Sequence, residues 1–256
     1  MIGTALCQRF EKNSIPHLQL SRNPSGSSKK LVYWNPEEKV LEHEKLREVD
    51  TVIHLAGENV GKRWTHNTRK KILSSRSDSS RFLFEKLAAQ DSPPKTLIAS
   101  SAIGIYGYKN STQFDEESPR GNGFLADVVE AWEESTQPLK DVGCRVILMR
   151  QGLVLSPKGG ALARMLPFFR FGLGGTLGSG QQMMSWIGME DQIRAILFFL
   201  EDDTQSGVYN LVSPKPVCNI EFTAILGWVL KRPTLFPVPA LALRAVFGEM
   251  AMQTML

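Results

Sequence analysis

Residues 50–59, DTVIHLAGEN, decide the fold, because an apolar β-branched run ends there in small residues. Residues 51–55 have the composition of a strand that is buried on both faces of a parallel sheet. At Ala56 and Gly57 the lack of a large side chain would let an adenosine lie against the backbone. The stretch therefore predicts a nucleotide site just beyond the carboxyl end of this strand.

A second stretch of the same kind, TLIASSAIGIYG, occupies residues 96–107. It ends in Ser100, Ser101 and a Tyr106-Gly107 turn, and the carboxyl ends of parallel strands meet at one edge of a sheet. We expect Ser100 to border the same ligand. Ser101 and Tyr106 are the candidate catalytic hydroxyls, since either could polarise a substrate oxygen. A tyrosine that packs in the core and bonds a backbone carbonyl is the alternative interpretation of Tyr106.

Further from these two stretches, short apolar runs alternate with longer amphipathic ones, which is typical of parallel βαβ units. We expect helices at 65–90, 124–140 and 189–202, and strands at 16–21, 30–34, 51–55, 96–100, 145–150 and 207–212. After about residue 155 the chain becomes rich in Gly and Pro. The prediction is an α/β protein with a Rossmann-like doubly wound parallel sheet over 1–155 and a small C-terminal substrate lobe over 156–256, interleaved with the last sheet strands.

The composition narrows the class of protein. Of the 256 residues, 42% are hydrophobic and 22% are charged, which excludes a disordered chain. Three cysteines far apart and four scattered histidines predict neither a disulfide framework nor a metal site, and they favour a cytoplasmic location. The longest apolar run, 195–200, is too short to span a bilayer. We expect a monomer or homodimer that binds a small-molecule substrate, with no nucleic acid and no membrane as partner.

The first 22 residues point to the cofactor. The chain opens with MIGTAL, the start of a helix, and Gly3 is the one glycine of the expected glycine-rich turn that is present. The strand predicted at 16–21 ends in Ser21 and Arg22, where dinucleotide folds place the residue that meets the adenosine ribose. A basic residue there accommodates a 2′-phosphate, so Arg22 predicts NADP rather than NAD.

The motifs, taken in order, resemble the atypical branch of the extended short-chain dehydrogenase/reductases, the NAD-dependent epimerase/dehydratase or sugar-nucleotide epimerase family. The resemblance covers nearly the whole chain, from Ile2 to about Gly248. It is carried by LAGENV (55–60), SSAIGIYG (100–107), MRQGLVLSPKGG (149–160), SWIGMED (185–191) and NLVSPKPV (210–217). It implies that NADP contacts Ser21, Arg22, Leu55, Ala56 and Arg76.

Two departures from the family pattern bear on the site. Members begin with an apolar strand and a glycine-rich turn and continue past residue 256, so we expect the printed chain to lack its first strand and a C-terminal segment. Members of the wider family also use a tyrosine with a lysine four residues on as the proton-transfer pair. At those positions stand Phe124 and Val128, neither of which moves a proton. The atypical branch commonly lacks this pair.

Several residues keep two interpretations. Arg150, at the end of a predicted strand, either binds a substrate anion or bonds loop carbonyls. His54 is expected to be a hydrogen-bonded core histidine. The glycines of 171–180 lack the lysine of a phosphate loop and indicate a flexible loop. The basic run from Lys62 to Arg76 is better explained as a solvated face near a phosphate than as a nucleic-acid site.

Two functions follow from this reading. The first is an NADP(H)-dependent oxidoreductase or epimerase that acts on a carbonyl or alcohol carbon of an unknown small molecule. The second is an NADP(H)-binding regulatory or sensor protein without turnover, which the missing tyrosine and lysine favour.

Overall fold

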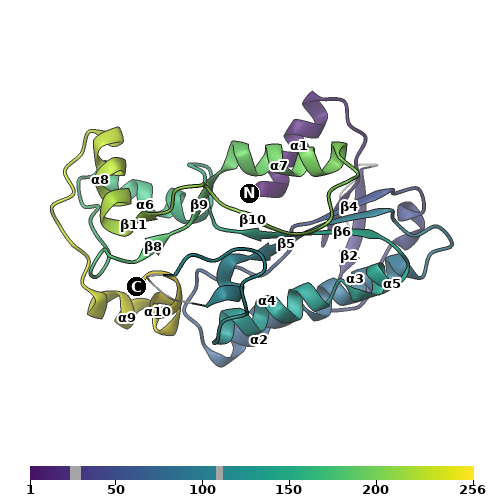
Figure 1. Cartoon of the computed structure of the whole chain (residues 1–256), viewed down its shortest axis with the longest axis horizontal. Coiled ribbons are helices and arrows are strands. Elements are labelled where there is room, and N and C mark those ends of the chain that lie inside the picture. Colours follow the sequence, from purple (N-terminus) through teal and green to yellow (C-terminus); the bar gives the residue numbers. More distant parts are fainter. Residues whose placement is uncertain (24–29, 108–111) are drawn as a thin grey trace.

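Four parallel strands form the centre of the molecule, in the order β10-β6-β5-β4 (Figure 1). The computed structural model describes residues 1–23, 30–107 and 112–256. Ile98 of the second strand along the chain lies opposite Ile53 on one side and Ile147 on the other. These three residues face one side of the sheet, and their chain neighbours Val52, Leu97 and Val146 face the other. Both faces are therefore covered, which explains the nearly continuous apolar runs. The four strands are β4 (Thr51–His54), β5 (Thr96–Ala102), β6 (Arg145–Gln151) and β10 (Gly207–Leu211).

A second, smaller sheet has the order β1-β2-β3. It comprises β1 (Gln19–Ser21), β2 (Leu31–Asn35) and β3 (Val40–Leu41), of which the first two are parallel. Leu20 of this sheet and Val52 of β4 pack on the same core cluster, although among the described residues no hydrogen-bonded strand joins the two sheets. The strand predicted at 16–21 is shorter than expected and begins at Gln19.

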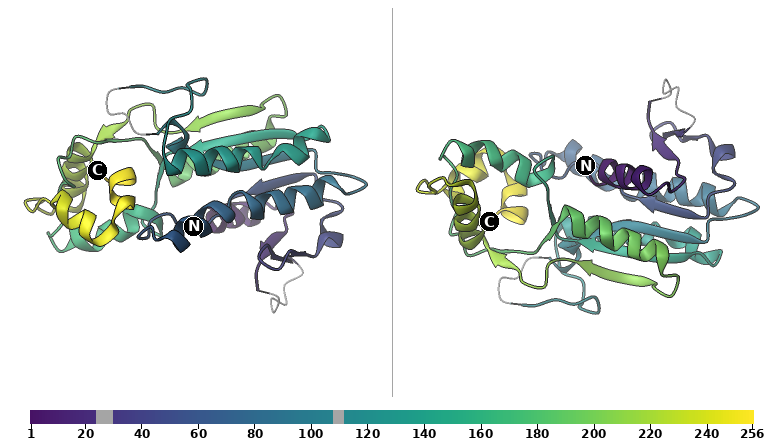
Figure 2. Two further views of the ribbon diagram at one scale, coloured as in Figure 1. Left: turned by 90° about the horizontal axis from the view of Figure 1, so that it is seen from below. Right: turned by 90° about the horizontal axis from the view of Figure 1, so that it is seen from above.

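Helices cover both faces of the sheet, as a doubly wound fold requires (Figures 1 and 2). On one face, α1 (Ile2–Lys12) and α7 (Met189–Glu201) pack together over the central strands. The opposite face carries α2 (His66–Ser74), α3 (Asp78–Ala88), α4 (Phe124–Glu134) and α5 (Gln137–Asp141). The predicted fold class, a Rossmann-like α/β protein, is therefore confirmed.

The remaining elements gather at one end of the long axis, as Figure 1 shows, and we refer to them as the C-terminal lobe. Its strands pair as β7 with β9 and as β8 with β11. The strands are β7 (Leu153–Leu155), β8 (Met183–Met184), β9 (Trp186–Gly188) and β11 (Val217–Cys218). The helices are α6 (Gly160–Arg170), α8 (Asn219–Leu230), α9 (Ala240–Phe247) and α10 (Glu249–Thr254). Two short 3-10 turns, η1 (His43–Leu46) and η2 (Ile103–Tyr106), complete the described elements.

Two predicted helices are each divided in the structure. The prediction of one helix over 65–90 is wrong, because α2 ends at Ser74 and α3 begins at Asp78. The Ser75 and Ser77 hydroxyls donate to backbone carbonyls three and four residues earlier, which competes with regular helix geometry. The helix predicted at 124–140 is divided in the same way, where the Ser135 and Thr136 hydroxyls bond the carbonyls of α4. The first break sets the position of Arg76.

Candidate functional site

The amino end of α1 lies beside the carboxyl end of β4. A Cβ on Gly3 would stand 4.0 Å from Leu55 Cδ1, the residue that follows this strand. Among the described residues no side chain caps α1, so its first N–H groups are left for another partner. The amino end of a helix also carries partial positive charge. This arrangement is suited to binding an anion, and it brings together Gly3 and Leu55, two of the residues expected to contact the cofactor.

Arg76 lies against Gly57, two residues beyond Leu55. A Cβ on Gly57 would stand 3.0 Å from Arg76 Cζ, so this glycine is what gives the guanidinium its space. The guanidinium also lies over the Trp132 ring, 4.9 Å from its centroid, and Nη1 donates to the Ile72 carbonyl at 3.3 Å. The structure thus places Gly57 and Arg76 in contact, two of the residues expected to contact the cofactor.

The surroundings of Arg76 destabilise its charged form. Burial lowers its pKa to about 10, and Glu58 opposes that shift only in part. No carboxylate of the described residues comes within ion-pair distance of it, although buried charges are normally paired. A largely buried cation that has no anionic partner in the protein chain is a candidate site for an anionic ligand.

Ser21 and Arg22 stand at the carboxyl end of β1. The Ser21 hydroxyl accepts a hydrogen bond from the Asn23 backbone at 3.1 Å, and Arg22 is exposed beyond it. An exposed arginine just past a strand end is free to turn toward a phosphate. Ala56 packs on the core cluster that also includes Leu20 of β1, so the ends of β1 and β4 belong to the same part of the fold.

Arg150 and Glu133 form a buried bidentate ion pair between β6 and α4. Arg150 Nε donates to Glu133 Oε1 and Nη2 donates to Oε2, both at 2.9 Å, and the two side chains are 11% and 15% exposed. The hydrogen bond to Glu133 is the main reason that the pKa of Arg150 lies above its usual value. Such a planar, two-point pair fixes α4 against the sheet.

The two candidate catalytic hydroxyls belong to the same network. Ser101 Oγ donates to Glu133 Oε1 at 2.5 Å. Tyr106 OH accepts from Arg150 Nη1 at 3.0 Å and donates to Asn210 Oδ1 at 2.8 Å, while its ring stacks on Phe114. Each hydroxyl proton is therefore already engaged by a protein acceptor. Tyr106 is packed, as the alternative interpretation expected, but its acceptor is a side-chain amide.

The geometry favours the structural interpretation of Arg150. Besides Glu133 and Tyr106, its Nη1 donates to the Glu116 carbonyl at 3.2 Å, so each guanidinium nitrogen has a protein partner. The Glu116 carboxylate in turn accepts from the Asn210 backbone at 2.6 Å. Sequence reasoning missed Glu133, Glu116 and Asn210. The signal that could have found Glu133 is a carboxylate on an otherwise apolar helix face.

The positions of the missing tyrosine and lysine are filled by an apolar cluster. Phe124 packs edge-on against Trp64 with ring centroids 5.1 Å apart, and Val128 is 2% exposed in the same cluster. Met250 of α10 covers them from the C-terminal lobe. This part of α4 therefore offers no proton-transfer group, and it serves instead to join the lobe to the sheet.

Among the described residues, no group of three or more His, Cys, Asp and Glu side chains could hold a metal ion. Nor does any described helix combine the length and the apolar character that a membrane-spanning segment needs.

Ser100 lies at the carboxyl end of β5 and is buried, next to Met149 of β6.

His54 is a core histidine, but the expected hydrogen bond is absent. Its ring packs edge-on between Trp34 and Phe84, and neither ring nitrogen has a partner among the described residues. Burial lowers the pKa of His54 from 6.5 to about 4, and the positive charge of Arg76 adds to this shift. His54 is therefore neutral at pH 7 and adds no positive charge beside Arg76.

This pKa predicts a loss of stability in acid. Between pH 6.5 and 4 the unfolded chain binds a proton that native His54 refuses, so the native state loses about 3 kcal/mol as the pH falls through that range. In urea unfolding at several pH values, a His54→Leu variant should lack this decrease in unfolding free energy between pH 6.5 and 4. The exposed His66→Gln variant is the control. A pH profile for His54→Leu that matches the unaltered chain would contradict the assignment.

A doubly wound sheet has a helix amino end at the carboxyl end of β4, and nearby a partly buried arginine without a carboxylate partner among the described residues. These features define the class: a Rossmann-type nucleotide-binding protein. Comparison with known proteins specifies the family. The model of the NAD dependent epimerase/dehydratase family matches residues 1–211, and the chain belongs to that family.

Relatives of similar length support this assignment. An epimerase family protein of Mycobacterium bovis is 40% identical over 252 residues, which are 98% of this chain and 83% of that protein. An epimerase family protein of Staphylococcus aureus is 34% identical over 255 residues, covering 98% and 84%. A crystal structure of the human epimerase family protein SDR39U1 (isoform 2) with NADPH superposes with a TM-score of 0.87 at 31% identity, covering 99% of this chain and 85% of that one.

Proposed function

We propose that this protein binds NADP(H) and uses it as an oxidoreductase or epimerase on a carbonyl or alcohol carbon of a small molecule. The observation that carries the proposal is Arg76, a largely buried cation with no carboxylate partner among the described residues, set against Gly57 beside the open amino end of α1. The similarity to a human relative solved with NADPH supports the choice of cofactor.

The residues present fit a dinucleotide. The N–H groups at the amino end of α1 would hold the pyrophosphate, because a helix amino end binds phosphate through both hydrogen bonds and its dipole. Ala56 and Gly57 would admit the adenosine, and a Cβ at Gly57 would displace the Arg76 guanidinium. Arg22 would pair with the 2′-phosphate, with Ser21 beside it. Ser100 would border the nicotinamide half.

Bound NADP(H) would exchange a hydride with the substrate: the reduced form would give it to a carbonyl carbon, and the oxidised form would take it from an alcohol carbon. The chain would bind and orient the two reactants. Ser101 and Tyr106 are the proposed proton donors to the substrate oxygen. For Tyr106 to donate, its 2.8 Å bond to Asn210 must be exchanged for one to the substrate. Arg150 would stay bonded to the tyrosine oxygen during this exchange and hold the ring in place.

A second function is favoured by one specific observation, namely that both hydroxyl protons are engaged by Glu133 and Asn210. Such a site suits an NADP(H)-binding regulatory or sensor protein that does not turn over. Substrate-dependent NADPH oxidation by a panel of aldehydes and ketones separates the two functions. A saturable rate that disappears in the Ser101→Ala and Tyr106→Phe variants would exclude the sensor, whereas NADPH binding without any such rate would favour it.

The choice between NADP and NAD is tested at Arg22. An Arg22→Ala variant should bind NADPH about 10- to 100-fold more weakly, because one charge-assisted hydrogen bond is worth about 1.5–3 kcal/mol. NADH lacks the 2′-phosphate, so its affinity should not change. Titrations of both cofactors that follow quenching of the five tryptophans provide the measurement. The exposed Arg47→Ala variant is the matched control, and equal losses for both cofactors would overturn the role of Arg22.

A further inference from the structure

Two segments of the C-terminal lobe carry positive charge without any negative charge. Residues 158–189 and 222–248 contain no Asp or Glu, while their cations are Lys158, Arg164, Arg170, Lys231, Arg232 and Arg244. Over the whole chain the two signs nearly balance, with 30 basic and 26 acidic residues. The acidic side chains of this lobe's helices, Glu221 and Glu249, stand at the first turns of α8 and α10, so the excess of positive charge lies in the two segments themselves.

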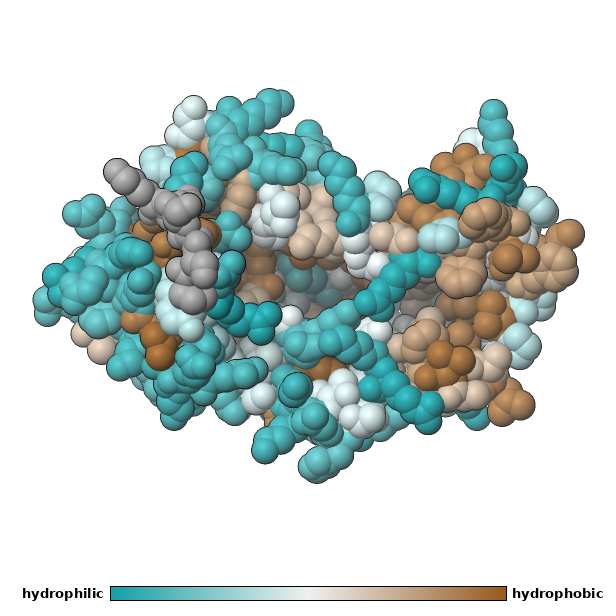
Figure 3. Space-filling model, turned by 180° about the vertical axis from the view of Figure 1, so that it is seen from behind, coloured by the Kyte–Doolittle hydropathy of each residue, from teal (hydrophilic) through white to brown (hydrophobic). Residues whose placement is uncertain are grey.

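The same segments expose large apolar side chains. Six of them, which we call the aromatic tip, are between 58% and 81% exposed: Phe168, Phe171, Leu173, Trp228, Leu235 and Phe236. Figure 3 shows apolar residues gathered at this end of the molecule, whereas the opposite end is mostly hydrophilic. Single exposed apolar residues are ordinary, but a contiguous group indicates an interaction site.

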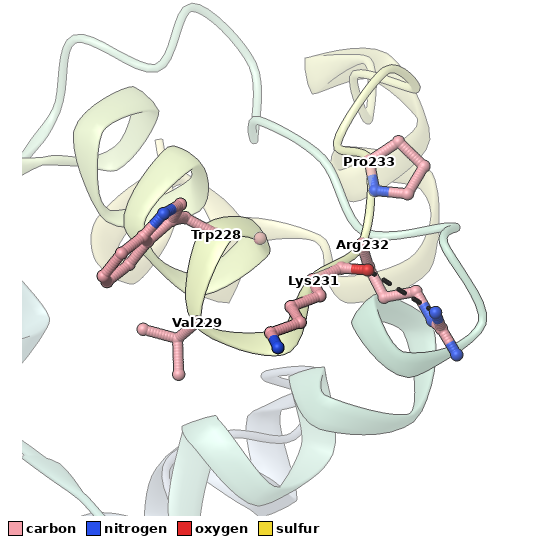
Figure 4. Close-up of a pocket in the computed structure, with 6 residues that line it drawn as sticks. Trp228, Val229, Lys231, Arg232 and Pro233 are labelled. Carbon is pink, nitrogen blue, oxygen red and sulfur yellow. Dashed lines mark hydrogen bonds between the residues drawn. The ribbon is translucent and has the colours of Figure 1, made fainter.

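The parts of the aromatic tip are adjacent in space. Helix α6 packs on α8, and Arg232 Nε donates to the Arg170 carbonyl at 2.8 Å, which joins the segments that follow these helices. In Figure 4, Trp228 and Val229 project from the same side of α8, with Lys231 close by. The hollow beside them, of about 600 Å³, is open to solvent. The tip is thus a set of protruding side chains with cations at its border.

Helix α8 has the composition of a helix that is covered on both sides. Its sequence, NIEFTAILGWVL, is apolar around most of its circumference, yet Ile225, Trp228 and Val229 are about half or more exposed. A helix that is apolar all round is normally buried. Something other than water is therefore expected to cover this face.

The positive charges around the aromatic tip favour an anionic lipid surface over a second copy of the chain or a partner helix. In a two-fold contact between two copies, the same patch meets itself, so Arg170, Lys231 and Arg232 would face their own like charges. A partner helix would need a groove with pockets for its anchor residues, whereas here the hollow is wide open to solvent and the apolar side chains protrude around it. An anionic lipid surface needs no pockets, accepts protruding Trp and Phe at the headgroup level, and attracts Lys and Arg.

We propose that the aromatic tip docks the protein on an anionic lipid bilayer. Phe171, Trp228 and Leu235 enter the boundary between headgroups and acyl chains, while Arg170 and Lys231 bind lipid phosphates. The expectation of no membrane partner rested on the absence of a spanning segment, and peripheral docking needs none. The carboxyl end of β4, with Arg76, belongs to a different part of the molecule and stays free to bind its cofactor.

Vesicle flotation of the full chain tests this directly. The protein should float with vesicles of phosphatidylcholine and phosphatidylserine and stay behind with pure phosphatidylcholine. Trp228 is the exposed tryptophan, whereas Trp34, Trp64 and Trp132 are buried, so its emission should shift to shorter wavelength on docking. The Trp228→Phe variant should still float but lose that spectral shift.

Charge and apolar variants separate the contributions. Arg170→Gln and Lys231→Asn should each weaken binding about fivefold, since one cation near the surface contributes about 1 kcal/mol. Phe171→Ser should weaken it about tenfold or more. Phe198→Ser, an exposed phenylalanine on α7, is the matched control and should bind normally. The proposal is overturned if the chain fails to float with acidic vesicles, if the tip variants bind like the control, or if light scattering shows a dimer that the tip variants dissociate.

Discussion

A Glu133→Gln variant should lose about 3–5 kcal/mol of unfolding free energy, because it leaves the buried Arg150 guanidinium without its counter-charge. Whole domains are stable by only about 5–15 kcal/mol, so this is a large fraction. The Arg150 and Glu133 side chains are only 11% and 15% exposed. An ion pair on the surface, in contrast, contributes only about 0–1 kcal/mol to stability. Urea unfolding of the variant against the unaltered chain gives the measurement.

The control lies one residue away. Glu134→Gln, exposed on the same helix, should change the unfolding free energy by less than about 0.5 kcal/mol. Replacing both partners by apolar residues, Glu133→Leu with Arg150→Met, should recover much of the loss, since no unpaired charge then remains. A Glu133→Gln variant as stable as the Glu134→Gln control would show that the pair is solvated in solution.

The same network explains why the sequence could predict the positions of the candidate hydroxyls but not their hydrogen-bond partners. Ser101 and Tyr106 were predicted from the strand that ends in them, and this strand is fixed by its own apolar run. Their partners Glu133 and Asn210 come from other elements, 32 and 104 residues away. No local pattern reports such a contact, because it depends on how α4 and β10 pack on β5.

The central sheet was predictable because its signal is local. Residues 96–100 and 145–150 are continuous apolar runs, and the strands found there, Thr96–Ala102 and Arg145–Gln151, differ by two residues or fewer at each end. The C-terminal lobe gave weaker signals. α6 contains Pro167, which argues against a helix interior. α8 is apolar around most of its circumference, so it lacks the usual separation into an apolar and a polar face.

Among the wrong predictions, that of one continuous helix in place of α2 and α3 has the largest consequence for the site. Leu73, Leu83 and Leu87 have helical spacing, which favoured one continuous helix over 65–90. The run SSRSDSS at 74–80 contains the opposing signal, since serine hydroxyls that bond nearby carbonyls weaken a helix. The irregular segment places Arg76 against Gly57 and over Trp132, where the candidate anion site lies.

Arg76→Met should separate cofactor binding from folding. Keeping the arginine charge in this environment lowers its pKa from 12.5 to about 10, which corresponds to a cost on the order of 3 kcal/mol. Methionine keeps an apolar chain of similar length against Trp132. It loses the cation–π contact and the bond to the Ile72 carbonyl, each worth about 1 kcal/mol. The variant should therefore fold as stably as the unaltered chain, within about 1 kcal/mol, or slightly more stably.

Its affinity for NADPH should nevertheless fall about 10- to 100-fold, because the ligand phosphate loses a charge-assisted partner in a site with little water to replace it. Calorimetric titration with NADPH measures the loss, and urea unfolding without cofactor confirms that folding is intact. Arg81→Met, an exposed arginine on α3, is the matched control. If Arg76→Met binds NADPH as tightly as this control, the buried cation is a structural feature and the anion site must be sought at the amino end of α1 alone.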